Sequence, residues 1–143
     1  MRSIRILLIL GALCIALGGC GSPGIPDHGW TAVEDQLQRA IVSSTDYPPG
    51  SIEVLASPTR VHVSVSDREL ARADHAARER AANALVAIVE QSIATNAQLA
   101  TVEEIQVVIV HPEEAHGLLG STHTEDVMDF KRGPDKQFCR DVL

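Results

Sequence analysis

The sequence predicts an α+β fold of two layers, with an α-β-β-α-β core, a C-terminal β-hairpin, and helices packed on one face of a mixed sheet. Three observations lead to this prediction. Apolar residues recur at helical spacing in two segments, they alternate or run together in three shorter ones, and two last short segments flank a strong turn sequence. The chain has 143 residues, 45% of them hydrophobic, which is enough for one core.

The first helix is predicted over residues 30–44. Its apolar side chains, among them Val33, Leu37 and Ile41, recur at three- and four-residue steps, with charged residues opposite. The segment Tyr47-Pro48-Pro49-Gly50 ends it, because proline removes a backbone donor and clashes with the preceding turn.

Two strands are predicted next, over residues 51–55 and 59–66, around a turn at residues 56–58. In the second strand Val61, Val63 and Val65 alternate with polar residues. Strict alternation predicts one buried face and one polar face, so we expect a hairpin whose outer face meets solvent.

A long helix is predicted over residues 68–96, which contain neither Gly nor Pro. Ser66 and Glu69 have the spacing of a capping box at its start. Such a helix is roughly 43 Å long, against roughly 25 Å for an eight-residue strand, so one end should overhang the sheet. The Ala- and Arg-rich first half, with Arg72, Arg78 and Arg80, is either a partner-binding surface or a solvated charged helix end.

The remaining strands are predicted at residues 104–110, 126–131 and 137–142. The first is nearly continuous in apolar residues and therefore central, and the crossover before it should leave it parallel to residues 59–66. The other two flank Gly133-Pro134-Asp135-Lys136 and form a terminal hairpin, with a disordered tail as the alternative. Cys139 is expected to be a half-buried strand residue.

Residues 1–19 have the pattern of a cleaved signal peptide. Arg2 and Arg5 form a basic start, and residues 6–17 are almost wholly apolar. Twelve helical residues span roughly 18 Å, short of the roughly 30 Å hydrocarbon core of a bilayer. We therefore expect a removable export signal and not a spanning helix.

The sequence Leu17-Gly18-Gly19-Cys20 resembles the lipobox of bacterial lipoproteins. The resemblance implies cleavage after Gly19 and attachment of fatty acyl chains such as palmitate to the Cys20 thiol, so that lipid anchors the mature chain to a membrane. Because Gly21 and not Asp follows, it also implies the periplasmic face of the outer membrane in a cell with two membranes. Residues 20–29 then form a lipidated tether, and residues 30–143 a single domain.

Composition argues against nucleic acid as a partner. Without Arg2 and Arg5, the chain keeps 10 basic residues against 19 acidic ones, and only 3% of its residues are aromatic. A net negative chain repels phosphate backbones, and single-stranded nucleic acid needs aromatic stacking platforms.

The predicted element order is similar to that of BON domains, small modules found in periplasmic and outer-membrane proteins. The similarity lies in the order of helices and strands alone. A shared fold does not carry a function.

Catalytic patterns are weak in this sequence. His111, His116 and His123 could contribute to a zinc site, although Pro112 replaces the Glu of the His-Glu-x-x-His pattern; the alternative is a polar surface loop. In the same segment Leu118 and Leu119 could form a recognition tip or pack into the core.

Together these observations predict a membrane-anchored lipoprotein of the bacterial cell envelope. We expect a non-catalytic binding or structural accessory module that needs no cofactor, with an envelope protein as a possible partner. The alternative is a metal-dependent hydrolase that uses the loop histidines.

Overall fold

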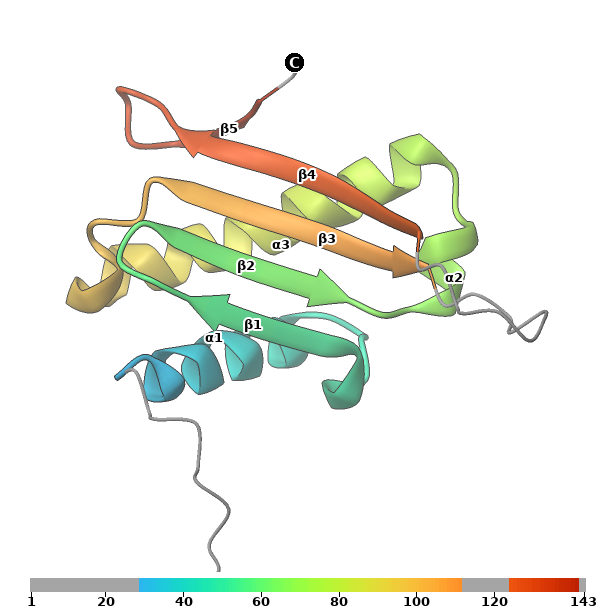
Figure 1. Ribbon diagram of the computed structural model, residues 1–143, viewed down its shortest axis with the longest axis horizontal. Coiled ribbons are helices and arrows are strands. Elements are labelled where there is room, and N and C mark those ends of the chain that lie inside the picture. The colour runs from blue at the N-terminus through green and yellow to red at the C-terminus, as the bar shows by residue number, and fades with distance from the viewer. Residues whose placement is uncertain (1–28, 112–123, 142–143) are drawn as a thin grey trace, which may run out of the picture.

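The computed structural model describes residues 29–111 and 124–141 (Figure 1). A five-stranded mixed sheet has its helices on one face, which confirms the predicted two-layer α+β fold. The helices are α1 (Thr31–Ser44), α2 (Arg68–Arg72) and α3 (His75–Thr95), with short 3-10 turns η1 (Pro49–Ser51) and η2 (Ala97–Leu99). The strands are β1 (Ile52–Ala56), β2 (Arg60–Val65), β3 (Glu104–His111), β4 (Thr124–Arg132) and β5 (Phe138–Arg140).

The strands lie in the sheet in their sequence order, β1-β2-β3-β4-β5. β1 and β2 form an antiparallel hairpin, and the crossover through α2 and α3 places β3 parallel to β2. β4 and β5 then add antiparallel neighbours. The predicted hairpins, the central strand and the parallel pair are therefore confirmed.

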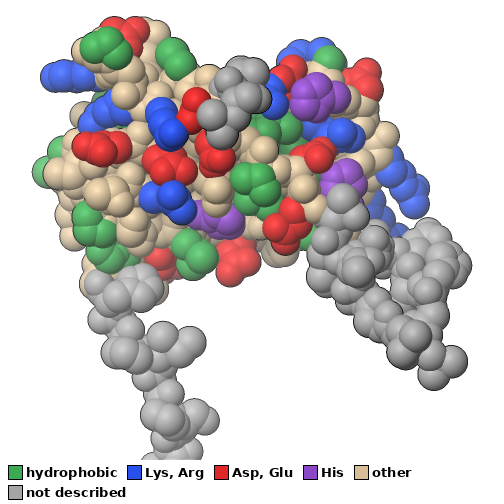
Figure 2. Space-filling view, turned by 45° about the horizontal axis from the view of Figure 1, so that its top comes forward, with side chains coloured by type: hydrophobic (Ala, Val, Ile, Leu, Met, Phe, Trp, Pro, Cys, Tyr) green, Lys and Arg blue, Asp and Glu red, His purple; other side chains and the backbone are tan. Residues whose placement is uncertain are grey.

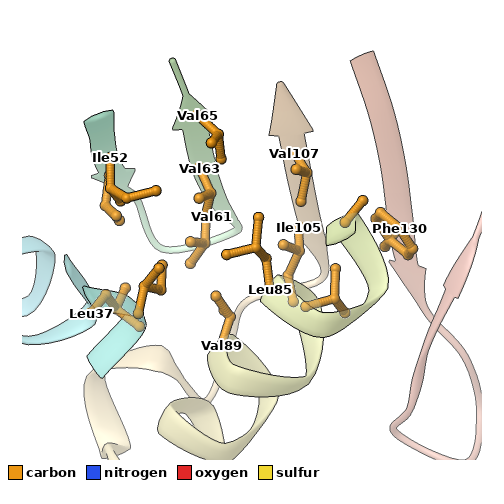
Figure 3. Close-up of a cluster of buried hydrophobic side chains, with 14 of the residues drawn as sticks. Leu37, Ile52, Val61, Val63, Val65, Leu85, Val89, Ile105, Val107 and Phe130 are labelled. Atoms are coloured by element: carbon orange, nitrogen blue, oxygen red, sulfur yellow. The ribbon is translucent and has the colours of Figure 1, made fainter. Parts of the chain in front are cut away.

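The core fills the space between the sheet and the helices (Figure 3). Val61, Val63 and Val65 are fully buried, as their alternation in the sequence predicts. They pack with Leu37 of α1 and Leu85 of α3 among other apolar side chains. With so few aromatic residues, this core is built almost entirely from aliphatic side chains, and packing between β-branched residues holds the two layers together.

The long helix predicted over residues 68–96 is divided in two. Ala73 and Asp74 have extended backbone angles, so α2 ends at Arg72 and α3 begins at His75. The Asp74 carboxylate accepts a hydrogen bond from the Ala77 backbone N–H and starts the second helix. Aspartate favours such N-cap positions because its side chain competes for backbone donors.

The predicted capping box at Ser66 is also wrong. The N-cap of α2 is Asp67, whose carboxylate accepts from the Leu70 N–H at 2.8 Å. The Ser66 backbone N–H still donates to the Ser51 carbonyl, so this residue continues the ladder between β1 and β2 and the helix starts one residue later.

The Ala- and Arg-rich half of the helix does not overhang the sheet as predicted. Arg78 forms an ion pair with Asp126 of β4, and Glu79 forms one with Arg140 of β5. The break at residues 73 and 74 leaves α3 with 21 residues, and β4 has nine. Both elements are therefore roughly 30 Å long, and side chains from the first half of α3 reach β4 and β5.

Helix side chains bind backbone groups at both edges of the sheet. At the β1 edge, Glu34 of α1 accepts from the Ala56 N–H at 2.8 Å and Gln38 donates to the Ile52 carbonyl at 2.9 Å. At the β5 edge, Glu90 of α3 accepts from the Phe138 N–H at 2.7 Å. Backbone groups that would otherwise offer a template for another strand are thereby occupied.

The chain enters the domain at one particular end of the sheet. We call this the turn end, because residues 57–59 and 133–137, which join β1 to β2 and β4 to β5, both lie there. Glu34 near the start of α1 contacts Ala56, the last residue of β1, and Gln36 contacts Asn96 at the end of α3. Within the described ranges, no helix is long and apolar enough to span a bilayer.

Candidate functional site

The candidate site is the face of the sheet opposite the helices, which we call the open face (Figure 1). Residues on this face alternate along each strand with those that enter the core. The cross-strand register assigns the following side chains to it: Glu53, Leu55, Arg60, His62, Ser64, Glu104, Gln106, Val108, Val110, Glu125, Val127, Asp129, Lys131 and Cys139.

A row of hydrogen-bonded polar side chains crosses the middle of the open face. Gln106 donates through Nε2 to Asp129 Oδ1 at 2.8 Å, and Gln106 Oε1 lies 2.9 Å from His62 Nδ1. A carboxylate only accepts, so the amide must turn its NH₂ toward Asp129 and its oxygen toward the imidazole. His62 must then carry a proton on Nδ1, and in its neutral form it leaves Nε2 as an acceptor.

The register of the sheet produces this row. His62 and Gln106 are direct partners in the parallel ladder of β2 and β3, and Gln106 and Asp129 are direct partners in the antiparallel ladder of β3 and β4. Directly paired residues on one face have their Cβ atoms roughly 5 Å apart, within reach of one hydrogen bond. All three side chains are partly buried and therefore held in place by their neighbours.

Toward the turn end, the open face carries two ion pairs. Arg60 Nη2 lies 2.9 Å from Glu104 Oε2 on the neighbouring strand, and Lys131 pairs with Asp141. The hydrogen bond to the Asp141 carboxylate and the negative charge of that group raise the pKa of Lys131. Both cations help to line a hollow at this end of the sheet, and each already has a carboxylate partner.

Toward the other end, the open face is apolar with acidic neighbours. Val108 and Val127 are direct partners, and Val110 follows Val108 on the same face; we call these three residues the valine patch. Val127 is 49% exposed, whereas its partner Val108 is buried. The patch is bordered on β1 by Glu53, across Ser64, and on β4 by Glu125, which pairs with Val110.

A second polar cluster lies on the helix side of the sheet. Asp126 Oδ2 is 2.5 Å from Arg78 Nε and 3.5 Å from His111 Nε2, and all three side chains are mostly covered. The guanidinium beside this carboxylate opposes a metal cation there. In residues 29–111 and 124–141, no group of three His, Cys, Asp or Glu side chains could hold a metal ion.

The structure gives the following places to the site residues predicted from sequence. His111 is the last residue of β3 and contacts Asp126, so it belongs to a strand and not to a loop. Arg80 is exposed on α3, Arg72 closes α2, and Arg78 is engaged with Asp126. Cys139 lies in β5 as expected, but it is exposed and not half-buried, because it points to the open face. The other predicted site residues lie outside the described ranges: Cys20, His116, Leu118, Leu119 and His123.

Neither the polar row nor the valine patch is apparent from the sequence. The alternation in β2 places His62 on the polar face, but nothing in the chain shows that Gln106 and Asp129 stand beside it, since that depends on the register of three strands. The only available signal was the polar residue at position 106 within the apolar run of β3.

In Figure 2, acidic, basic and hydrophobic side chains are interspersed over the visible face of the molecule. In comparisons with protein-family models, curated proteins and solved structures, nothing matches this chain.

Proposed function

We propose that the chain is a lipid-anchored protein of the bacterial cell envelope whose domain acts as a binding or accessory module. The observation that carries this proposal is the segment Leu17-Gly18-Gly19-Cys20, directly after a basic start and a short apolar run. In this proposal the Cys20 thiol receives diacylglycerol, the chain is cleaved after Gly19, and acyl chains hold the protein to the membrane.

The open face supports a binding role for the domain. Its polar row is fixed by hydrogen bonds before any partner arrives, so little side-chain entropy is lost on association. Leu55 and Val127 are the two large exposed hydrophobic residues of the described part of the chain, and both lie on this face. Exposed apolar residues with polar neighbours are typical of protein interaction sites.

If the cell has two membranes, the proposed anchor lies in the periplasmic face of the outer membrane. Support comes from Gly21, because an Asp after the lipidated Cys marks retention in the inner membrane in proteins of this kind. Membrane fractionation tests this point: wild type should sediment with the outer membrane, and Gly21→Asp should move to the inner membrane.

Mass spectrometry of the protein purified from its own membranes tests the anchor itself. We expect a chain that begins at Cys20 and carries two or three acyl chains, and incorporation of labelled palmitate. Cys20→Ser should abolish both acylation and processing after Gly19. Cys14→Ser and Cys139→Ser are matched controls, and both should be processed and acylated like wild type. A retained leader or an unmodified Cys20 would overturn the proposal.

A further inference from the structure

We propose that the valine patch and the carboxylates beside it dock a positively charged segment of a partner protein, with apolar side chains at its centre. The proposal rests on the proposed function, because it names the partner chemistry of the same binding module. It is carried by the juxtaposition of Val108, Val110 and Val127 with Glu53 and Glu125.

In the described part of the chain, two carboxylates beside the patch have no ion-pair partner. Both cations of the open face, Arg60 and Lys131, lie toward the turn end and are paired with carboxylates there. Glu53 and Glu125 are exposed and have no ion pair within residues 29–111 and 124–141. Asp129, next to Val127 on this face, has the neutral amide of Gln106 as its hydrogen-bond partner and lies close enough to Lys131 to interact with its charge. Three carboxylates therefore face a partner from around one apolar centre.

This arrangement matches the anatomy of a protein interface, in which an apolar centre is surrounded by a polar rim. Val127 at 49% exposure would be covered by the partner's apolar side chains, and Val108 supplies a firm, already buried floor beside it. Lys or Arg residues at the edge of the partner would meet Glu53, Glu125 and Asp129. Such rim charges steer encounter and select the partner by sign.

Two other occupants fit the surface less well. A second copy of this chain would place the same carboxylates against each other, and the chain as a whole carries a formal charge of −7. An added β-strand would bind at a sheet edge and not over the valine patch, and Glu34 and Glu90 already occupy one backbone donor on each edge strand. The proposed partner therefore meets the face of the sheet.

Site-specific photocrosslinking in intact envelopes tests the proposal with the full, anchored chain. A photoreactive amino acid replaces Val127, and a second protein carries it at Ala87, which is exposed on α3 on the helix side. We expect a defined protein adduct from position 127 and none of the same size from position 87. Sequencing the crosslinked peptide by mass spectrometry should show a segment rich in Lys or Arg with apolar residues between them.

Charge reversal shows whether the carboxylates select the partner. With the crosslinker at position 127, Glu53→Lys combined with Glu125→Lys should lower the adduct yield at least about fivefold, because like charges would now meet. The matched control combines Asp35→Lys with Asp46→Lys, which makes the same charge change at exposed positions in α1 and just after it, and should change the yield less than about twofold. If the reversed chain is poorly folded by circular dichroism, Glu53→Gln with Glu125→Gln replaces it and should still lower the yield.

Several results of these experiments would overturn the docking proposal. Adducts with a second copy, with lipid or with a neutral or acidic peptide overturn the proposal, and so does the absence of any adduct at position 127 or an equal yield from the two charge variants. Any of these results with a chain that is acylated at Cys20 leaves the anchor standing and rejects only the docking surface.

Discussion

Glu34 Oε1 accepts a hydrogen bond from the backbone N–H of Ala56 at 2.8 Å, which joins the first turn of α1 to the outer edge of β1, 22 residues later. Glu90 of α3 makes the equivalent bond to Phe138 at the opposite edge of the sheet. Thus α1 and α3 each support the sheet in two ways: their apolar side chains pack against its covered face, and one carboxylate binds a strand edge.

Removing these carboxylates should weaken and expose the strand edges. We expect Glu34→Ala and Glu90→Ala each to lower the free energy of unfolding by about 1 kcal/mol, since a charge-assisted hydrogen bond is lost at a partly buried site. Amide hydrogen exchange at Ala56 and Phe138 should accelerate in the corresponding variant only. Glu34→Gln and Glu90→Gln keep an acceptor oxygen and should retain most of the protection. Equal exchange in the Ala and Gln variants would contradict the edge role.

The two neighbouring arginines of α3 should differ in their effect on stability. Arg78→Ala removes the guanidinium from the mostly covered Asp126 and its hydrogen bond to the Ala73 carbonyl, and it should cost about 1–2 kcal/mol, because among the described residues that carboxylate keeps His111 alone nearby. Arg80→Ala, at an exposed position on the same helix, should stay within about 0.5 kcal/mol of wild type. Denaturant unfolding followed by the fluorescence of Trp30 measures both. Similar losses from the two variants would mean that the contacts of Arg78 with Asp126 and Ala73 contribute little.

The polar row should fix the tautomer of His62. In the neutral imidazole the proton should sit on Nδ1, where it is donated to Gln106 Oε1. Nitrogen-15 NMR of the imidazole reads the tautomer directly at a pH where the ring is neutral. Gln106→Ala should remove the preference, whereas Ser64→Ala, on the same face of β2 but outside the row, should leave it unchanged. A neutral His62 protonated on Nε2 in the wild type would refute the orientation of the row.

Tyr47 is the single tyrosine of the chain, so alkaline spectrophotometric titration reports on it alone. Partial burial and, second, the negative charge of Asp67 raise the pKa of Tyr47 above its ordinary value of 10.0. Because the folded state disfavours the phenolate, this group's contribution to stability is fully present below pH 10 and is lost as the pH rises through the folded-state pKa.

A substitution at the neighbouring aspartate separates the two causes. Asp67→Asn removes the charge but keeps a side-chain oxygen for the N-cap of α2. The titration midpoint of Tyr47 should then fall, yet stay above its value in denaturant, because burial remains. A midpoint unchanged between the folded and the denatured chain would contradict the raised pKa.

Much of the architecture is encoded in local patterns. The alternation of Val61, Val63 and Val65, the helical spacing of Val33, Leu37 and Ile41, and the turn sequence after Arg132 each depend on near neighbours in the chain, and the structure confirms the elements that they predict. Periodicity identifies an element and its buried face without reference to the rest of the fold.

The features that the sequence did not reveal depend on longer-range geometry or on a close competition between neighbours. The row from His62 to Asp129 requires the register of three strands, and the closed edges require that Glu34 and Glu90 reach strands far along the chain. At the start of α2, Ser66 and Asp67 are both good N-caps, and the ladder to β1 decides in favour of the aspartate. At Asp74 a side-chain cap outweighs the helical propensity of the alanines around it.

Because the chain enters the domain at the turn end, any attachment through the preceding residues holds the domain at that end. A pull or a support applied through Gly29 acts on the corner formed by the start of α1, the end of β1 and the end of α3. The strands extend away from that corner, so the sheet is held at one end, and its open face, opposite the helices, is uncovered along the strands. The valine patch lies on this open face toward the end opposite the turn end, so a partner can reach it away from the point where the chain enters the domain.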